Sequence, residues 1–235
     1  MTKAILIAIS LWTALGCSQF QNKESGEAVQ EFQDTCSTFV AVGRVKICLP
    51  AVDSMVEQYT DSLIKVWADG HEIKGNTILS LYLHNPARYH TTPSGQKNYD
   101  DYFKIYQVDN LKDLNVDEKY LTEVADAITT TNTFFNWGET QKKLETDYKF
   151  ITPDQPYFID HYSPHPHVRS FVTLYRYSPE GAYETLLLGV MNIMLIKKRL
   201  VGLTYYKAFT GYDVLSRSRT INDAIVSKVM AVNGE

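Results

Sequence analysis

The fold is decided by the stretch VRSFVTLYRY (168–177), SPEG (178–181), AYETLLLGVMNIMLI (182–196), KKR (197–199) and LVGLTYYKAF (200–209). Its three long runs are rich in Val, Ile, Leu and Tyr, and short polar segments separate them, which is typical of β-strands joined by turns. The stretch therefore predicts an antiparallel meander. The apolar residues 186–196 are too few to span a bilayer, which takes roughly 20, and indicate a central strand.

Apolar segments before the meander predict further strands. Residues 38–50 are rich in β-branched residues, and Gly43 interrupts their alternation, so we expect either a bulged strand or a tight hairpin there. Residues 77–83 and 102–108 also have strand character. The polar, Pro-containing segment 85–101 between them predicts a surface loop.

A first helix is predicted to begin after Asp53 and Ser54 and to end at Gly70. Apolar residues follow at helical spacing, and Glu57 completes a capping pattern. Residues 63–68 alone also fit a strand, so that alternative stays open.

A second helix follows Asp117, with apolar side chains spaced for one buried face, and should end in the Thr129–Thr131 run. A short helix over 139–144, a strand near Tyr157 and an amphipathic C-terminal helix over 221–229 complete the prediction. Together these elements predict an α+β fold, an antiparallel sheet covered by helices in an α/β/α sandwich. We expect a single domain over residues 36–235.

The N-terminus has the order of an export signal. Lys3 precedes the apolar run 4–9, and small residues stand before Cys17. Gly16–Cys17 resembles the cleavage site of bacterial lipoproteins, which implies removal of residues 1–16 and acylation of Cys17. By the same resemblance, Ser18 permits export to the outer membrane. The alternative is an ordinary secretory signal with an incidental cysteine.

Two further cysteines, Cys36 and Cys48, remain in the mature chain. Disulfides persist outside the cytoplasm, so an even pair of cysteines predicts a bridge, with two unpaired thiols as the alternative. Polar residues dominate 17–35, which is typical of a flexible tether between a lipid anchor and a domain.

Charge excludes one class of partner. The 23 Lys and Arg against 27 Asp and Glu give a net charge of -4, without the basic excess that neutralises phosphates. We therefore expect no nucleic-acid partner.

The chain has 16 tyrosines, and we single out six in the predicted strands as candidates for a binding face. Such residues form either an aromatic binding face or part of the sheet core, and the sequence leaves both readings open. The six are Tyr102, Tyr106, Tyr175, Tyr177, Tyr205 and Tyr206.

One local cluster has metal-ligand chemistry. On an extended backbone His165 and His167 would face one side and share a metal, with His161 or Asp160 as a third ligand. The favoured interpretation is a Pro-rich loop with three surface histidines. The sequence has no Gly-x-Ser-x-Gly elbow, HExxH, CxxC or phosphate-binding glycine motif, so it predicts no catalytic residue and no cofactor.

Two segments resemble known families. Residues 193–206, a strand and charged tip followed by RLVGLTYY (199–206), resemble the Mog1/PsbP/DcrB-like group. Residues 42–50, VGRVKICLP, resemble the opening strand of lipase-immunity lipoproteins of type VI secretion. The second resemblance implies a protein that neutralises a secreted toxin by occluding it.

The sequence thus predicts a lipid-anchored, non-enzymatic protein-binding module at the periplasmic face of the outer membrane. Its partners would be the bilayer, through acyl chains, and a toxin or envelope component. The alternatives are a metal-binding or metal-dependent hydrolytic lipoprotein and a structural lipoprotein of an envelope assembly.

Overall fold

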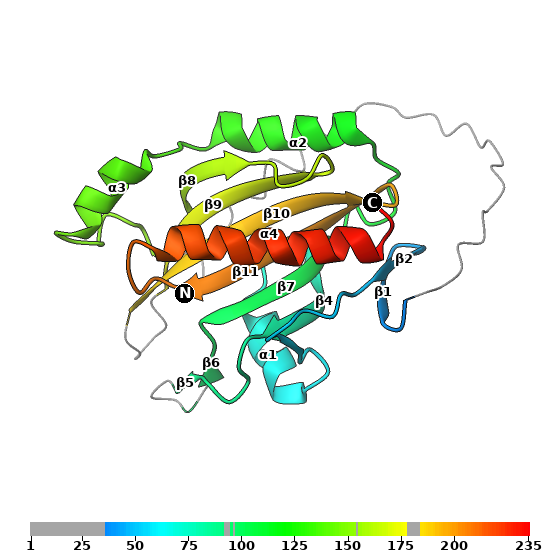
Figure 1. Ribbon diagram of the computed structural model, residues 1–235, viewed down its shortest axis with the longest axis horizontal. Coiled ribbons are helices and arrows are strands. Elements are labelled where there is room, and N and C mark those ends of the chain that lie inside the picture. The colour runs from blue at the N-terminus through cyan, green and yellow to red at the C-terminus, as the bar shows by residue number, and fades with distance from the viewer. Residues whose placement is uncertain (1–35, 92–94, 96, 154, 178–183) are drawn as a thin grey trace.

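A computed structural model describes residues 36–91, 95, 97–153, 155–177 and 184–235. The fold is mixed α+β, with four helices and a seven-stranded antiparallel sheet of order β3-β4-β7-β11-β10-β9-β8 (Figure 1). The strands of the large sheet are β3 (Val56–Glu57), β4 (Asn76–Leu83), β7 (Asp101–Val108), β8 (Tyr157–Tyr162), β9 (Val168–Tyr177), β10 (Thr185–Ile196) and β11 (Arg199–Ala208). Two small hairpins and the helices are β1 (Phe39–Val42) with β2 (Val45–Cys48), β5 (His90–Thr91) with β6 (Lys97–Asn98), α1 (Ser62–Gly70), α2 (Glu118–Thr131), α3 (Trp137–Leu144) and α4 (Val214–Val232).

The predicted meander is confirmed. β10 pairs with β9 on one side and with β11 on the other, so the apolar segment is a central strand of the sheet. Lys197 and Lys198 form the two-residue turn between β10 and β11, and both have positive φ, as a type I′ turn requires. The predicted turn at 178–181 lies outside the described residues.

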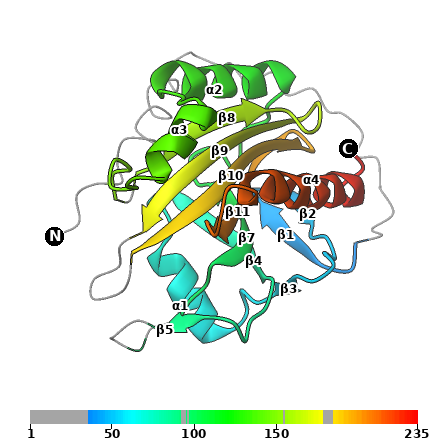
Figure 2. The same ribbon diagram turned by 60° about the vertical axis from the view of Figure 1, so that its left-hand side comes forward.

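Helices cover both faces of the sheet. Alternate residues of each strand point to opposite faces, so Met194 packs under α4 while Ile193 packs under α2. α1 packs on this same second face, over β4. Figures 1 and 2 show α4 on one side of the sheet and α1 and α2 at opposite edges of the other.

A buried amide pair fixes α4 on the sheet. Asn192 of β10 and Asn222 of α4 each donate to the other's Oδ1, at 2.7 and 3.1 Å. Ser170 Oγ donates to Asn192 Oδ1 at 2.6 Å. All three side chains are fully buried, and their hydrogen bonds offset the cost of burying them.

The prediction for the first helix was wrong at its start. Asp61, not Asp53, is its N-cap, and the Asp61 carboxylate accepts from the amides of Leu63 and Ile64. The preceding chain does not continue the helix, because Ser54 has φ +66° and β3 pairs with β4. The helix ends at Gly70 as predicted, and the strand alternative for residues 63–68 was wrong.

The other expected elements are present. Gly43 lies in a hairpin turn with φ +58°, where a Cβ would stand 2.5 Å from the Lys112 carbonyl, so the hairpin alternative is confirmed. The Asp117 carboxylate caps α2, which ends at Thr131. The expected loop at 85–101 also contains β5 and β6. Among the described residues, no helix is both long and apolar enough to span a membrane.

Candidate functional site

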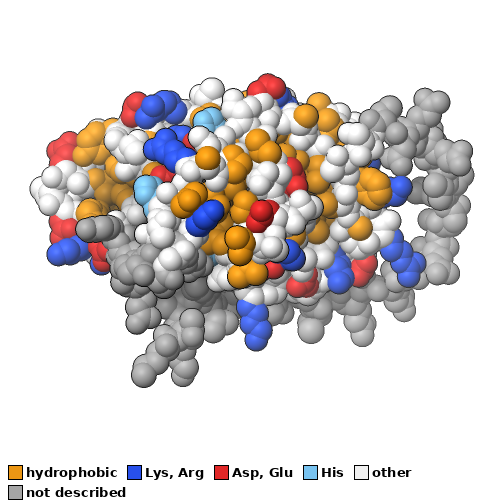
Figure 3. All heavy atoms as spheres, turned by 90° about the horizontal axis from the view of Figure 1, so that it is seen from below, with side chains coloured by type: hydrophobic (Ala, Val, Ile, Leu, Met, Phe, Trp, Pro, Cys, Tyr) orange, Lys and Arg blue, Asp and Glu red, His pale blue; other side chains and the backbone are white. Residues whose placement is uncertain are grey.

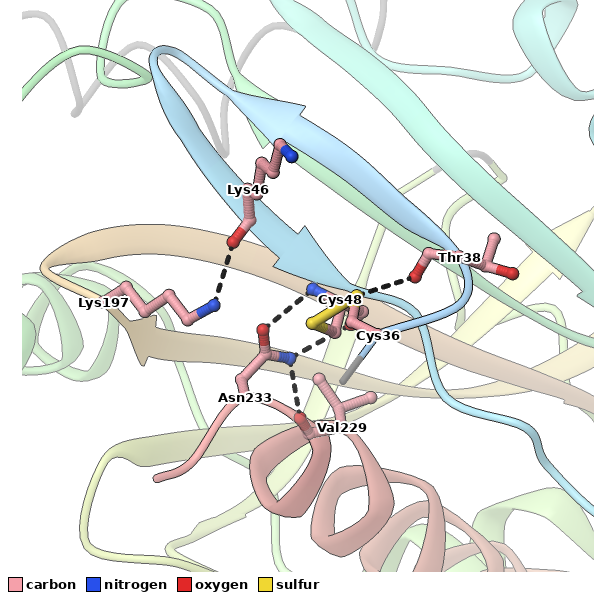
Figure 4. The surroundings of a disulfide bond; sticks show 7 residues. All are labelled: Cys36, Thr38, Lys46, Cys48, Lys197, Val229 and Asn233. Atoms are coloured by element: carbon pink, nitrogen blue, oxygen red, sulfur yellow. Dashed lines mark hydrogen bonds between the residues drawn. A yellow bond between two sulfur atoms is a disulfide. The ribbon is translucent and has the colours of Figure 1, made fainter. Parts of the chain in front are cut away.

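The predicted disulfide is present in the structure. Cys36 and Cys48 are bridged, with their Cα atoms 5.6 Å apart (Figure 4). Cys36 stands just before β1 and Cys48 ends β2, so the bridge closes the open end of this hairpin. Cys17 and the expected tether lie outside the described residues.

Asn233 joins this hairpin to α4. Its Oδ1 accepts from the Cys48 amide at 2.8 Å, and its Nδ2 donates to the Cys48 carbonyl at 3.0 Å. The same Nδ2 donates to the Val229 carbonyl of α4 at 2.8 Å. One buried side chain therefore satisfies both backbone groups of Cys48 as a neighbouring strand would.

The three candidate histidines do not form a ligand set. His161 lies in β8, with its ring edge-to-face against Phe134, whereas His165 and His167 lie in the connection to β9. The rings of His165 and His167 are 5.6 Å apart. Nowhere in the described chain do three or more His, Cys, Asp or Glu residues form a group suited to a metal ion.

His167 instead lies between two carboxylates. Its Nε2 lies 3.0 Å from Glu118 Oε1 at the start of α2, and its Nδ1 lies 3.0 Å from Glu235 Oε2. Both ring nitrogens are occupied, and the metal hypothesis gains no support from this geometry.

Five of the six candidate tyrosines gather on the sheet face that carries α1 and α2. Tyr205 is the exception: it is fully buried beneath α4, and its hydroxyl donates to Asp101 at 3.0 Å. Tyr206 stacks on Tyr102 at 5.0 Å between ring centroids, and Tyr175 tilts against Tyr206 at 5.8 Å. We call Tyr102, Tyr106, Tyr175, Tyr177 and Tyr206 the tyrosine face.

A buried ion pair lies within the tyrosine face. Lys104 Nζ donates to Glu72 Oε2 at 2.6 Å, and the two side chains are only 9% and 6% exposed. The ammonium also lies 5.5 Å from the Tyr106 ring centroid and 5.7 Å from that of Tyr206, within cation–π range. This Lys is thus neutralised and enclosed by aromatic rings.

Two glycines allow the tyrosine rings to lie flat on the sheet. A Cβ at Gly202 would stand 2.3 Å from the Tyr106 ring, and a Cβ at Gly189 would stand 2.8 Å from the Tyr175 ring. Gly202 is paired directly with Tyr106 on the neighbouring strand. The rings thus occupy the space of the missing side chains.

α1 borders the tyrosine face. Trp67 packs edge-on against Tyr102 at 5.1 Å, and His71 Nε2 lies 2.5 Å from the Tyr177 hydroxyl. Because His71 Nδ1 donates to the Trp67 carbonyl, Nε2 of the neutral ring accepts from Tyr177. On its outer side, α1 exposes Leu63 and Val66, each to 72%.

Comparison of the chain with models of known families, with curated proteins and with solved structures finds no match. The function must therefore be argued from the site itself.

Tyr102 and Tyr106 of the tyrosine face are buried, with 9% and 8% exposure, so these two rings belong to the packed interior and not to an open binding surface. Burial raises the pKa values of the Tyr102, Tyr106, Tyr175 and Tyr206 hydroxyls above their usual range, which keeps them as neutral hydrogen-bond donors. Phenols stack and donate hydrogen bonds, and Lys104 is already paired.

Sequence reasoning missed Lys104 and Glu72. Lys104 left a signal, because it stands between Tyr102 and Tyr106 at two-residue spacing in an otherwise apolar strand, and a buried Lys needs a carboxylate partner. Glu72 left none, because it lies in the connection between α1 and β4, where a charged residue is ordinary.

Proposed function

We propose that this protein is a lipid-anchored binding module of the bacterial cell envelope. Acyl chains on Cys17 would hold it at the periplasmic face of the outer membrane, and its α+β domain would recognise a protein partner. The disulfide supports the compartment, since such bridges persist outside the cytoplasm.

The observation that carries the binding role is the exposed apolar flank of α1. Leu63 and Val66 are the most exposed large apolar side chains in the described part of the chain, and they lie one helical turn apart. Adjacent exposed apolar residues mark protein contacts. The tyrosine face lies directly behind this helix.

Seen from below, the molecule shows hydrophobic side chains in patches, with charges of both signs between them (Figure 3). This mixed surface suits a protein partner better than a polyanion. The expectation of no nucleic-acid partner is therefore retained in the proposal.

The specific form we propose is an immunity protein that occludes a secreted toxin. The resemblance of residues 42–50 to type VI lipase-immunity lipoproteins supports it, and these residues form the strand β2 and its flanks. A Mog1/PsbP/DcrB-like fold is the corresponding fold proposal, which agrees in outline with an antiparallel sheet covered by helices.

Cell fractionation tests the anchor. We expect the wild type in the membrane fraction, with an acyl mass increment on its N-terminal peptide, and no such increment in Cys17→Ala. A wild-type protein without acylation would contradict the anchored form of the proposal.

A photo-crosslinking amino acid at Val66 tests the binding surface in living cells. We expect a discrete protein adduct from Val66 that is lost in Leu63→Asp. The control position is Thr220, which is exposed on α4 across the sheet. Equal adducts from both positions would refute α1 as the contact.

Mixed culture tests the immunity role. A strain that lacks this gene should be killed in contact with its own parent, and the wild-type gene should restore survival while the Leu63→Asp gene should not. If the deletion strain survives, and the Val66 adduct is an envelope component, the assembly alternative replaces the immunity role.

A further inference from the structure

Four segments of the chain meet at one end of the molecule, around the disulfide. The Lys197 side chain donates to the Lys46 carbonyl of the β1–β2 hairpin at 3.1 Å, as Figure 4 shows. The Val116 amide donates to the Lys198 carbonyl, which places the 111–116 loop beside the same turn. Asn233 brings in the end of α4 through Cys48.

This end is basic, although the chain as a whole is acidic. It has five basic residues (Arg44, Lys46, Lys112, Lys197 and Lys198) and three acidic residues (Asp113, Glu235 and Glu118, which meets Glu235 through His167). The other described residues include 16 Lys and Arg and 18 Asp and Glu, so they carry a small negative charge. Lys and Arg side chains, with some Asp and Glu among them, are visible toward the right-hand end of Figure 3.

Exposed apolar side chains accompany the basic residues. Phe39 of β1 is 47% exposed, with the Lys46 ammonium 4.5 Å from its ring centroid. Leu114, in the adjoining loop, and Val232, next to Asn233, are also exposed. Basic residues next to exposed aromatic and aliphatic ones are the combination that binds the surface of an anionic bilayer.

The chain enters the domain at the same end. Cys36 is the first described residue, and its disulfide fixes it against β2 and the end of α4. If Cys17 is the lipid-bearing residue, 18 residues separate the anchor from Cys36, a reach of at most about 65 Å. Anchoring would therefore keep this end at high effective concentration near the bilayer.

We propose that this end, formed by the β1–β2 hairpin, the Lys197–Lys198 turn, Leu114 and Val232, docks on the anionic lipid surface that holds the anchor. The inference rests on the proposed lipid anchoring. Docking there would orient the domain with α3 away from the membrane, because α3 lies at the opposite end of the molecule (Figure 1). The flank of α1 would face sideways, accessible to a partner.

The test supplies the anchor chemically. Cys17 is the only cysteine outside the disulfide, so the chain from Cys17 onward, which contains every described element, can be coupled through it to a maleimide lipid. Vesicles would consist of phosphatidylcholine alone or mixed with phosphatidylglycerol, and would carry a photoactivatable diazirine lipid. Mass spectrometry of the peptides then locates the lipid adducts.

On phosphatidylglycerol vesicles we expect adducts on the peptide of residues 39–48 to exceed those on residues 62–70 at least fivefold. Leu63 and Val66 are more exposed than Phe39, so labelling governed by apolar exposure alone would favour α1. Removing phosphatidylglycerol should abolish the preference. Arg44→Gln and Lys197→Gln should each lower hairpin labelling about fivefold.

The control is Lys142→Gln with Lys143→Gln, a twofold larger loss of charge, on α3, which should leave hairpin labelling unchanged. Far-UV circular dichroism and an intact disulfide verify that each variant is folded. Stronger labelling of α1 than of the hairpin, or labelling that does not depend on phosphatidylglycerol, would overturn the proposed docking surface. Because the anchor is supplied chemically, absence of natural acylation would refute the proposed anchoring without affecting this result.

Discussion

At the scale of single residues, Asn233 is the clearest structural determinant. It lies just beyond α4, yet its amide completes the hydrogen bonding of β2. We expect Asn233→Ala to lower the free energy of unfolding by about 1–3 kcal/mol, because it leaves two buried backbone groups of Cys48 unpaired. Urea denaturation measures the change. Asn233→Asp keeps the acceptor but sets a buried carboxylate oxygen against the Cys48 and Val229 carbonyls, so it should cost at least as much as Asn233→Ala. Losses well below 1 kcal/mol in both variants would contradict this account.

The histidines give a second residue-scale prediction. His167 lies between two carboxylates at a partly exposed position and His161 contacts one ring, so replacing His161, His165 and His167 with Ala should lower the free energy of unfolding by no more than about 1 kcal/mol. Thermal unfolding of wild type and triple variant, each with and without zinc after chelation, measures this. A zinc-dependent rise in Tm present only in the wild type would restore the metal hypothesis.

At the scale of elements, the start of α1 distinguishes two aspartates. Asp61→Ala should lower the free energy of unfolding by about 1 kcal/mol, because two amides of the first turn lose their acceptor. Asp53→Ala should have little effect, since the Asp53 carboxylate is exposed and pairs only with Lys228 at the surface. The two denaturation midpoints, compared directly, test the assignment; the reverse ranking would support the helix start predicted from sequence.

The contact between β7 and β11 gives a second element-scale prediction. Gly202→Ala should lower the free energy of unfolding by about 1–3 kcal/mol, because its Cβ would overlap the Tyr106 ring. Gly70→Ala is the matched control: a Cβ there meets nothing within 4 Å, and it should be neutral or slightly stabilising. When Tyr106 is first replaced by Leu, Gly202→Ala should lower the free energy of unfolding by less than it does in the wild type. An unchanged loss would show that the Tyr106 ring is not the cause.

At the scale of the whole molecule, buried phenols set an alkaline limit to stability. Burial raises the pKa of Tyr82 to about 12 and those of Tyr102, Tyr106 and Tyr206 above the usual value near 10. The folded state thus holds these protons more tightly than the unfolded state. The contribution of these protonated phenols to the free energy of unfolding is therefore complete below pH 10, and it declines as the pH rises toward 12 and beyond.

We therefore expect the tyrosinate absorption of these residues to appear together with the loss of circular dichroism in a stepwise alkaline titration. Each such phenol adds up to about 1.4 kcal/mol per pH unit to the slope with which the free energy of unfolding falls at alkaline pH. Tyr102→Phe should therefore make that slope shallower. Complete tyrosinate formation with preserved circular dichroism would show that the phenols are accessible in the folded protein.

Local patterns predicted most elements of the fold. The meander, α2 and the Gly43 hairpin depend on residue spacing, turn chemistry and caps, which act within a few positions of the chain. The predicted start of α1 was wrong because Asp53 and Asp61 both precede apolar residues at helical spacing. Which of the two caps the helix depends on the pairing of β3 with a strand some 25 residues later. Sequence periodicity contains no information about that pairing.

The sequence alone predicted the order of most strands and helices, the bridged cysteine pair and the six candidate tyrosines, because each of these depends on neighbouring residues or on composition. The three-dimensional structure was needed to show that five tyrosines share a face while Tyr205 lies beneath α4, that Lys104 meets Glu72, and that Asn233 completes β2. These outcomes depend on strand register and helix placement, which bring together residues 32 to 185 positions apart in the chain. Such long-range contacts arise from packing of the whole core, which no local segment specifies.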